Sequence, residues 1–91
     1  MKVVVTFPIP DVAKQLISEH AVLQCWESEE SIPASTLIDW ATDAHAILTT
    51  LTCSIDRELL AHAQQLKLIS TVSVGVDHID VYAAAEHGVI V

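Results

Sequence analysis

Short apolar runs alternate with amphipathic stretches along the whole chain. The runs are rich in β-branched residues and have the lengths of strands in a covered sheet. Between them, apolar residues recur at the three- and four-residue spacing of one helical face. The five predicted strands are residues 3–7, 21–26, 46–49, 68–72 and 89–91.

Four helices are predicted between these strands, each with a recognisable start. Asp11, Asp56 and Asp80 stand where an N-cap carboxylate would accept a backbone N–H, and Pro33 suits a first helical turn. Gly88 follows the last helix, where a left-handed residue is common. The side chains predicted to face the core are Val12, Leu16 and Ile17 in the first helix, Leu37, Trp40 and Ala41 in the second, and Ile55, Leu59 and Ala63 around the third.

This alternation predicts an α/β fold with a parallel sheet, because parallel neighbours need a crossover connection. Right-handed crossovers and the common strand order lead us to expect the order 2-1-3-4-5, with helices on both faces. The chain stops inside its last apolar run, so we expect a truncated domain.

Composition excludes several classes of protein. Twelve acidic residues against four Lys and Arg give a net charge of -8, which disfavours binding to nucleic acid. An apolar content of 52% argues against intrinsic disorder. The uncharged run 44–55 is too short to cross a membrane, so a cytoplasmic protein is the default expectation. A mean hydropathy of +0.47 predicts apolar surface that is covered by a second copy or by the rest of a longer chain.

The cysteines and histidines show no strong motif. Cys25 lies at the end of the second predicted strand and Cys53 follows the third. The predicted order separates these two strands, so structural thiols are favoured over a reactive pair. The sequence Asp77, His78 and Asp80 could supply metal ligands, but a capped helix with solvated side chains is the favoured interpretation. The five histidines are scattered at positions 20, 45, 62, 78 and 87.

Known phosphate loops and nucleophile elbows are absent from the sequence. Gly75 and Gly88 are the only glycines, so neither a Gly-x-Gly-x-x-Gly nor a Walker A loop can be formed. No serine stands in a Gly-x-Ser-x-Gly context.

The most informative stretch is 70–80, where a strand runs through a glycine turn into a capped helix. Ligands bind at the carboxyl ends of strands in open α/β sheets, and free backbone N–H groups attract anions there. Gly75 would let a ligand approach the backbone closely. No cation lies nearby, so a small carboxylate is favoured over a phosphate; the alternative is a plain connecting turn.

Several stretches together resemble the D-isomer-specific 2-hydroxyacid dehydrogenase family, in particular its glyoxylate and hydroxypyruvate reductases. The resemblance is carried by residues 73–80 (SVGVDHID), 83–84, 87–91, 46–48, 55–60 and 66–70. It implies a flavodoxin-like substrate domain, of which residues 1–91 form the N-terminal part. It also implies that the backbone of Val74, Gly75 and Val76 binds the substrate carboxylate and that Leu51 lines the substrate pocket.

The same resemblance implies that the Rossmann domain for NAD(H) or NADP(H) and the catalytic residues lie outside this chain. We therefore expect no catalytic, cofactor or metal residue here, and no activity from the chain alone. The implied substrate is a small 2-oxo or D-2-hydroxy acid of the glyoxylate or hydroxypyruvate type. The alternative is a stand-alone, non-catalytic α/β binding or association module derived from that family.

Overall fold

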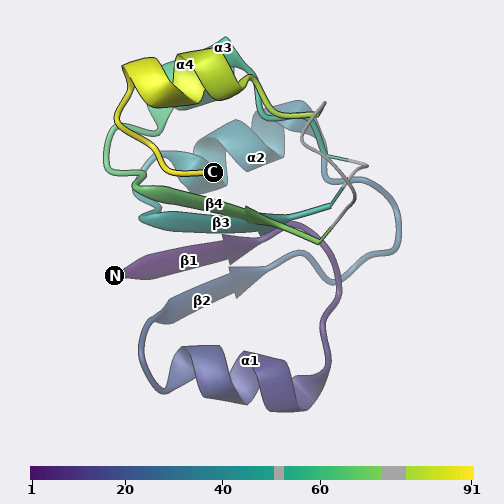
Figure 1. The fold of residues 1–91 in the computed structure, drawn as a ribbon. Helices are drawn as coiled ribbons and strands as arrows, with labels where there is room; N and C mark the ends of the chain where they lie inside the picture. Colours follow the sequence, from purple (N-terminus) through teal and green to yellow (C-terminus); the bar gives the residue numbers. More distant parts are fainter. Residues whose placement is uncertain (51–52, 73–77) are drawn as a thin grey trace.

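The computed structural model describes residues 1–50, 53–72 and 78–91 as strands and helices in strict alternation (Figure 1). The elements are β1 (Lys2–Val5), α1 (Asp11–Ser18), β2 (Val22–Cys25), α2 (Ala34–Ala41), β3 (Ala46–Thr49), α3 (Arg57–His62), β4 (Leu68–Thr71) and α4 (Val81–Glu86). Within these described residues, no helix is long and apolar enough to cross a membrane.

The four strands form one parallel sheet in the order β2-β1-β3-β4. This confirms the predicted α/β fold with a parallel sheet. At the place of the expected fifth strand there is a single parallel bridge between Leu68 and Ile90. The Ile69 N–H donates to the Ile90 carbonyl at 2.7 Å, and the Ile90 N–H donates to the Lys67 carbonyl at 2.9 Å. Residues 89–91 therefore lie beside β4 but form a single bridge with it, and not the predicted fifth strand.

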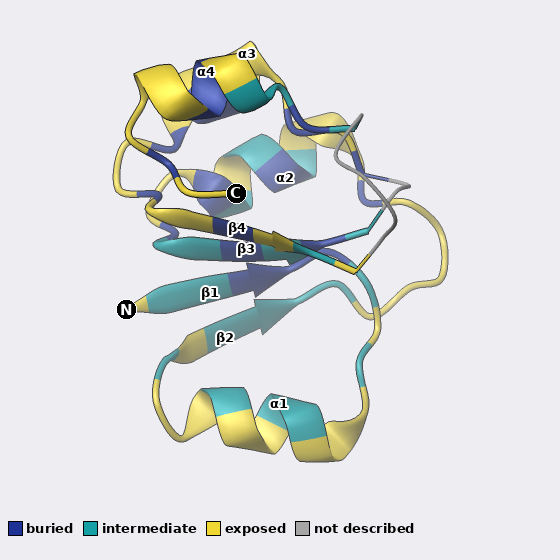
Figure 2. Ribbon diagram, in the orientation of Figure 1, coloured by how far each residue is buried: buried dark blue, intermediate teal, exposed yellow. Residues whose placement is uncertain are grey.

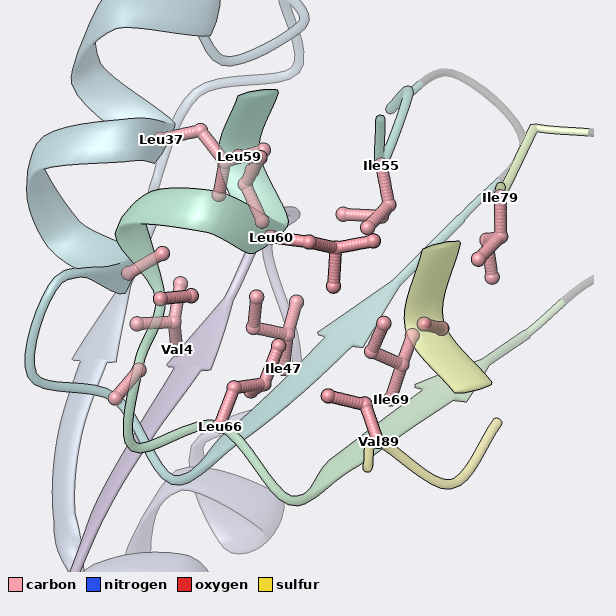
Figure 3. Packing of buried hydrophobic residues seen from close by; sticks show 14 of the residues in the cluster. Val4, Leu37, Ile47, Ile55, Leu59, Leu60, Leu66, Ile69, Ile79 and Val89 are labelled. Carbon is pink, nitrogen blue, oxygen red and sulfur yellow. The ribbon is translucent and has the colours of Figure 1, made fainter. Parts of the chain in front are cut away.

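Helices cover both faces of the sheet, but unequally. Figure 1 shows α1 on one side and α2, α3 and α4 together on the other. The three-helix side holds the core, where Val4, Ile47 and Ile69 from adjacent strands are each at most 1% exposed. Leu37, Leu59 and Leu60 pack on them from α2 and α3, as Figure 3 shows.

The third and fourth helices begin where the sequence predicts. Asp56 accepts a hydrogen bond from the Leu59 N–H, and Asp80 accepts one from the Ala83 N–H, both at 2.9 Å. Such a cap satisfies a backbone donor that the first helical turn leaves unpaired. Gly88 has a φ of +72°, as expected after the last helix.

Two predictions about the first helix are wrong. Its N-cap is Pro10 and not Asp11, because the Pro10 carbonyl already accepts from the Ala13 and Lys14 N–H groups. Asp11 is the first helical residue, and its carboxylate lies 3.7 Å from the Lys14 Nζ.

The face of the first helix that meets the sheet also differs from the prediction. Val12 and Leu16 are exposed, whereas Ala13 and Ile17 are half-buried. In Figure 2, α1 carries only the colours of exposed and intermediate residues. Both pairs follow helical spacing, so periodicity alone could not choose between them. Which pair faces the sheet depends on the path of residues 6–10, which connect β1 to α1.

On the α1 side, the sheet is left open over β3 and β4. In the parallel register, Leu68 lies beside Ala46 and Ile90 lies beside Leu68. Leu68 is 44% exposed, Val72 is 64% exposed and Ile90 is 69% exposed. We call Leu68, Val72 and Ile90 the open face, because α1 lies on the same face of the sheet but packs against β2, at the opposite edge.

Replacing Leu60 with Ala should lower the free energy of unfolding by about 2–5 kcal/mol, since Leu60 is fully buried between α3 and the sheet. Leu16→Ala is the matched control: the same atoms are removed from an exposed position, and stability should change by less than about 0.5 kcal/mol. Chemical denaturation followed by circular dichroism measures both values. Equal losses in the two variants would contradict the described core.

The open face should make the isolated 91-residue chain associate, because exposed apolar side chains favour contact with another surface. Light scattering at several concentrations should show dimers or larger species. The double variant Leu68→Lys, Ile90→Lys should shift the chain toward monomer. A compact monomer at every concentration would contradict this expectation.

Candidate functional site

The carboxyl ends of three adjacent strands carry a row of threonines. Thr49 and Thr71 are paired in the register of β3 and β4, and Thr6 follows Val5, which is paired with Leu48. Because successive strand residues alternate between faces, all three threonines point to the side that holds the core. Apolar packing therefore gives way to hydroxyl groups at the edge where ligands bind in parallel sheets.

Two hydroxyl groups of this row, those of Thr6 and Thr49, are hydrogen-bonded although they are buried. Thr6 and Thr49 are 5% and 0% exposed. The Thr6 hydroxyl donates to the Thr49 Oγ1 at 3.1 Å, and the Thr49 hydroxyl donates to the Thr50 carbonyl at 3.4 Å. A buried hydroxyl without a partner would cost stability, so these contacts allow polar atoms this deep in the fold.

Cys53 lies against the same row and is only 6% exposed. Burial raises the pKa of its thiol, and hydrogen bonds with Thr49 and Thr6 oppose that effect. The pKa of the Cys25 thiol is also raised. The larger cause is burial, and the second is the nearby negative charge of Glu27. Both cysteines are free. Because the thiolate is the nucleophilic form, these environments favour the structural role over a reactive pair.

His78 lies in the connection between β4 and α4. Its Nε2 lies 3.0 Å from the Thr71 Oγ1, and its Nδ1 is buried with no hydrogen-bond partner among the described residues. Its carbonyl accepts from the Ile55 N–H at 2.9 Å, and the Ile55 carbonyl accepts from the Asp80 N–H at 2.8 Å. The residue is therefore fixed to two neighbouring segments, one through its side chain and one through its backbone.

The other histidines lie apart from this edge. The His45 Nδ1 accepts a hydrogen bond from the Lys2 N–H at 3.0 Å. This contact lies at the amino ends of β1 and β3, away from the threonine row. The His87 Nδ1 lies 2.8 Å from the Ala83 carbonyl within α4 and its cap. His20 and His62 are exposed. Across residues 1–50, 53–72 and 78–91, no three His, Cys, Asp or Glu side chains are grouped as metal ligands.

The residues that the family resemblance singles out, Leu51, Val74, Gly75 and Val76, lie outside the described residues, and so does Asp77. The structure does place the residues that flank them. The Val72 N–H donates to the Thr49 carbonyl at 2.9 Å, and Thr49 is paired with Thr71. Residues 51–52 and residues 73–77 therefore follow the ends of two strands that are neighbours in the sheet.

Neither the threonine row nor the contact between His78 and Thr71 was predicted from the sequence. A signal for the threonines was present, since three apolar runs each reach a Thr at or just after the strand end: Thr6, Thr49 and Thr71. No sequence pattern shows that His78 meets Thr71, because the contact depends on the path of the chain between them.

Comparison with known proteins gives a consistent result. Residues 3–91 match the catalytic domain of the D-isomer specific 2-hydroxyacid dehydrogenases. The glyoxylate reductase of Pyrococcus furiosus is 33% identical over 90 residues, which are 99% of this chain and 27% of that enzyme.

Solved structures share the fold of this chain. The TT0316 protein of Thermus thermophilus superposes with a TM-score of 0.90 at 32% identity, over 99% of this chain and 29% of that one. NAD⁺-bound 3-phosphoglycerate dehydrogenase of Entamoeba histolytica shares the fold, with a TM-score of 0.80 at 22% identity over 99% of this chain and 32% of that one. The chain thus spans between a quarter and a third of the length of these relatives. It belongs to the D-isomer specific 2-hydroxyacid dehydrogenase family.

Proposed function

We propose that this chain is the substrate-binding segment of an NAD(P)-dependent oxidoreductase that acts on 2-oxo and D-2-hydroxy acids of the glyoxylate or hydroxypyruvate type. The observation that carries the proposal is the pairing of Thr49 with Thr71 on neighbouring parallel strands. It supports a shared edge for the segment with Leu51 and the segment with Val74, Gly75 and Val76. Ligands bind at this edge in open α/β sheets.

The chemistry of this edge suits a carboxylate held by neutral donors. Residues 46–56 and 68–91 contain no Lys or Arg. Of the chain's four cations, Lys2, Lys14 and Arg57 form ion pairs with Asp43, Glu27 and Glu86 at 2.6–2.7 Å. Backbone N–H groups of 74–76 would therefore hold the anion, with Leu51 as an apolar wall. A carboxylate accepts charge-assisted hydrogen bonds well from such donors.

The nicotinamide cofactor that the family uses does not fit this chain. The dinucleotide fingerprint needs three glycines in six residues, whereas the chain has two glycines, thirteen positions apart. We therefore assign NAD(H) or NADP(H), and the residues that transfer hydride and protons, to a part of the enzyme outside residues 1–91. The role left for this chain is to bind and orient the carboxylate.

Gly75→Val should raise the KM for glyoxylate in the full-length enzyme by about tenfold or more, because a charge-assisted hydrogen bond contributes about 1.5–3 kcal/mol. The added branched side chain would stand where the carboxylate approaches the backbone. Steady-state kinetics measures the effect.

Val76→Ala is the control, since it keeps the backbone N–H and removes only side-chain atoms. Its KM should stay within about threefold of wild type. An unchanged KM in Gly75→Val, with the protein folded, would overturn the proposed carboxylate site.

The 91-residue chain alone should neither bind NADH or NADPH nor reduce glyoxylate, because it lacks the phosphate loop. Titration calorimetry with each cofactor should give no specific heat, whereas the full-length protein should bind one of them. Micromolar binding by the short chain would contradict the proposed division of roles.

A further inference from the structure

We propose that the outer edge of β2 binds an extended, basic segment of another protein, and that a pocket beside this edge receives a Lys or Arg side chain of that segment. The proposal goes beyond the substrate site. The pocket includes Lys2, the first residue of β1, whereas the threonine row lies at the opposite ends of the strands. Three features of the described residues carry the proposal: an unpaired strand edge, a pocket next to it, and an excess of negative charge around both.

The outer edge of β2 has no neighbouring strand. β2 is the last strand on its side of the sheet formed by the described residues (Figure 1). The Val22 N–H points toward β1, where it donates to the Met1 carbonyl at 2.9 Å. Because the backbone groups of successive strand residues point in opposite directions, the N–H and carbonyl groups of Leu23 and Cys25 point away from β1. These groups are available to a further strand.

β2 also lacks common features that protect an edge strand from pairing. Charged side chains and proline usually serve this purpose. The strand has the sequence Val-Leu-Gln-Cys, with neither a charge nor a proline. Val22 is 66% exposed, so the described residues leave the start of the strand open to solvent. An extended segment can therefore add to β2 through backbone hydrogen bonds, a mode of binding in which pockets for alternate side chains supply the specificity.

A pocket of about 430 Å³ lies beside β2. Gln24 is paired with the core residue Val4, so the Gln24 side chain lies on the face of the sheet that holds the core. This side chain is half-buried, and its amide has no hydrogen-bond partner among the described residues. An amide both donates and accepts, so it offers polar contacts to a ligand. The lining residues are Lys2, Gln24, Asp39, Trp40, Thr42 and Asp43.

The pocket contains one positive and two negative side chains. The Lys2 Nζ lies 2.6 Å from the Asp43 Oδ1 and donates to the Trp40 carbonyl at 2.9 Å. The hydrogen bond with Lys2 also lowers the pKa of the Asp43 carboxyl. Asp39 is exposed, and its carboxylate forms no ion pair with the described residues. One further cation would therefore balance the charge of the pocket.

A Lys or Arg side chain suits this pocket better than a metal ion. A residue paired beside Gln24 in an added strand would point to the same face as Gln24. Its long apolar stem can lie along Trp40, and its charged end can reach Asp39. The Trp40 ring is itself held by an edge-to-face contact with Trp26, with 5.9 Å between the ring centroids. A metal ion needs several ligands, and the described residues contain no group of three His, Cys, Asp or Glu that could supply them.

The surface that follows β2 has the charge that attracts a basic segment. Residues 27–30 are exposed and include three Glu. Glu27 pairs with Lys14 at 2.7 Å, whereas Glu29 and Glu30 form no ion pair with the described residues. The whole chain has a net charge of -8. A second copy would bring the same charge, so these observations favour a basic segment of a different protein.

The test uses the full-length enzyme and the fluorescently labelled peptide acetyl-Val-Lys-Val-Lys-Val-Thr-amide, with fluorescence anisotropy as the measurement. We expect saturable binding with a micromolar Kd. The control peptide has norleucine in place of both lysines, which keeps the apolar stem and removes the charge. It should bind about tenfold more weakly, because the charged contacts in the pocket are lost.

N-methylation of alternate backbone amides tests the addition of a strand. One set of alternate amides in the bound peptide faces β2, and the other set faces solvent. Two peptides, each methylated at one of these sets, should therefore differ. One should lose binding, and the other should keep a Kd within about threefold of the unmethylated peptide. This comparison needs no variant of the enzyme.

Asp39→Asn tests the pocket. The variant removes the unpaired carboxylate charge and should weaken binding of the lysine peptide by about threefold to tenfold. Binding of the norleucine peptide should not change, because the two groups act through the same contact. Asp11→Asn makes the same replacement on α1, at the other face of the sheet, and should leave the Kd within about twofold. Both variants should keep the wild-type kcat and KM for glyoxylate.

The proposal is overturned if the lysine peptide shows no saturable binding, whether the edge of β2 is then empty or is covered by a second copy or by the rest of the enzyme. It is also overturned if both N-methylated peptides bind as well as the unmethylated one, since that result indicates adsorption to a negative surface. Equal weakening of the lysine and norleucine peptides by Asp39→Asn would show that the pocket does not receive the basic side chain.

Discussion

The parallel register of β1, β3 and β4 is the constraint on which the rest of the molecule depends. Backbone hydrogen bonds hold Val4, Ile47 and Ile69 side by side, and this row is the floor of the core. Because the strands run in the same direction, the register that aligns these apolar residues also aligns Thr49 with Thr71 two residues later. A slip of one residue would turn both rows to the other face. Core and candidate site are therefore fixed by the same pairing.

The chemistry at the site edge follows from how few charges the fold can place there. Three of the four cations are engaged in ion pairs, and the net charge is -8. An anionic substrate would gain nothing from the overall field of the chain. Recognition would depend on short-range hydrogen-bond donors in a defined geometry.

The two faces of the sheet are covered by helices to different extents. Three helices bury one face, whereas α1 covers only the part near β2, so Leu68, Val72 and Ile90 remain exposed. The high mean hydropathy predicted such a surface. Its location could not be predicted, because it depends on which side of the sheet each helix crosses.

Local patterns in the chain predicted the described strands and helices and their order, and the resemblance of its motifs predicted the family that the family match shows. Apolar periodicity places β3 at its observed bounds, and the carboxylates of Asp56 and Asp80 mark the helix starts, because these features act over a few residues. Three features became known from the folded chain alone: which face of α1 turns inward, that residues 89–91 supply a single bridge, and that His78 meets Thr71. Each of these depends on how distant segments approach one another. Helical spacing and strand alternation carry no information about that approach, because they describe only the residues within one element.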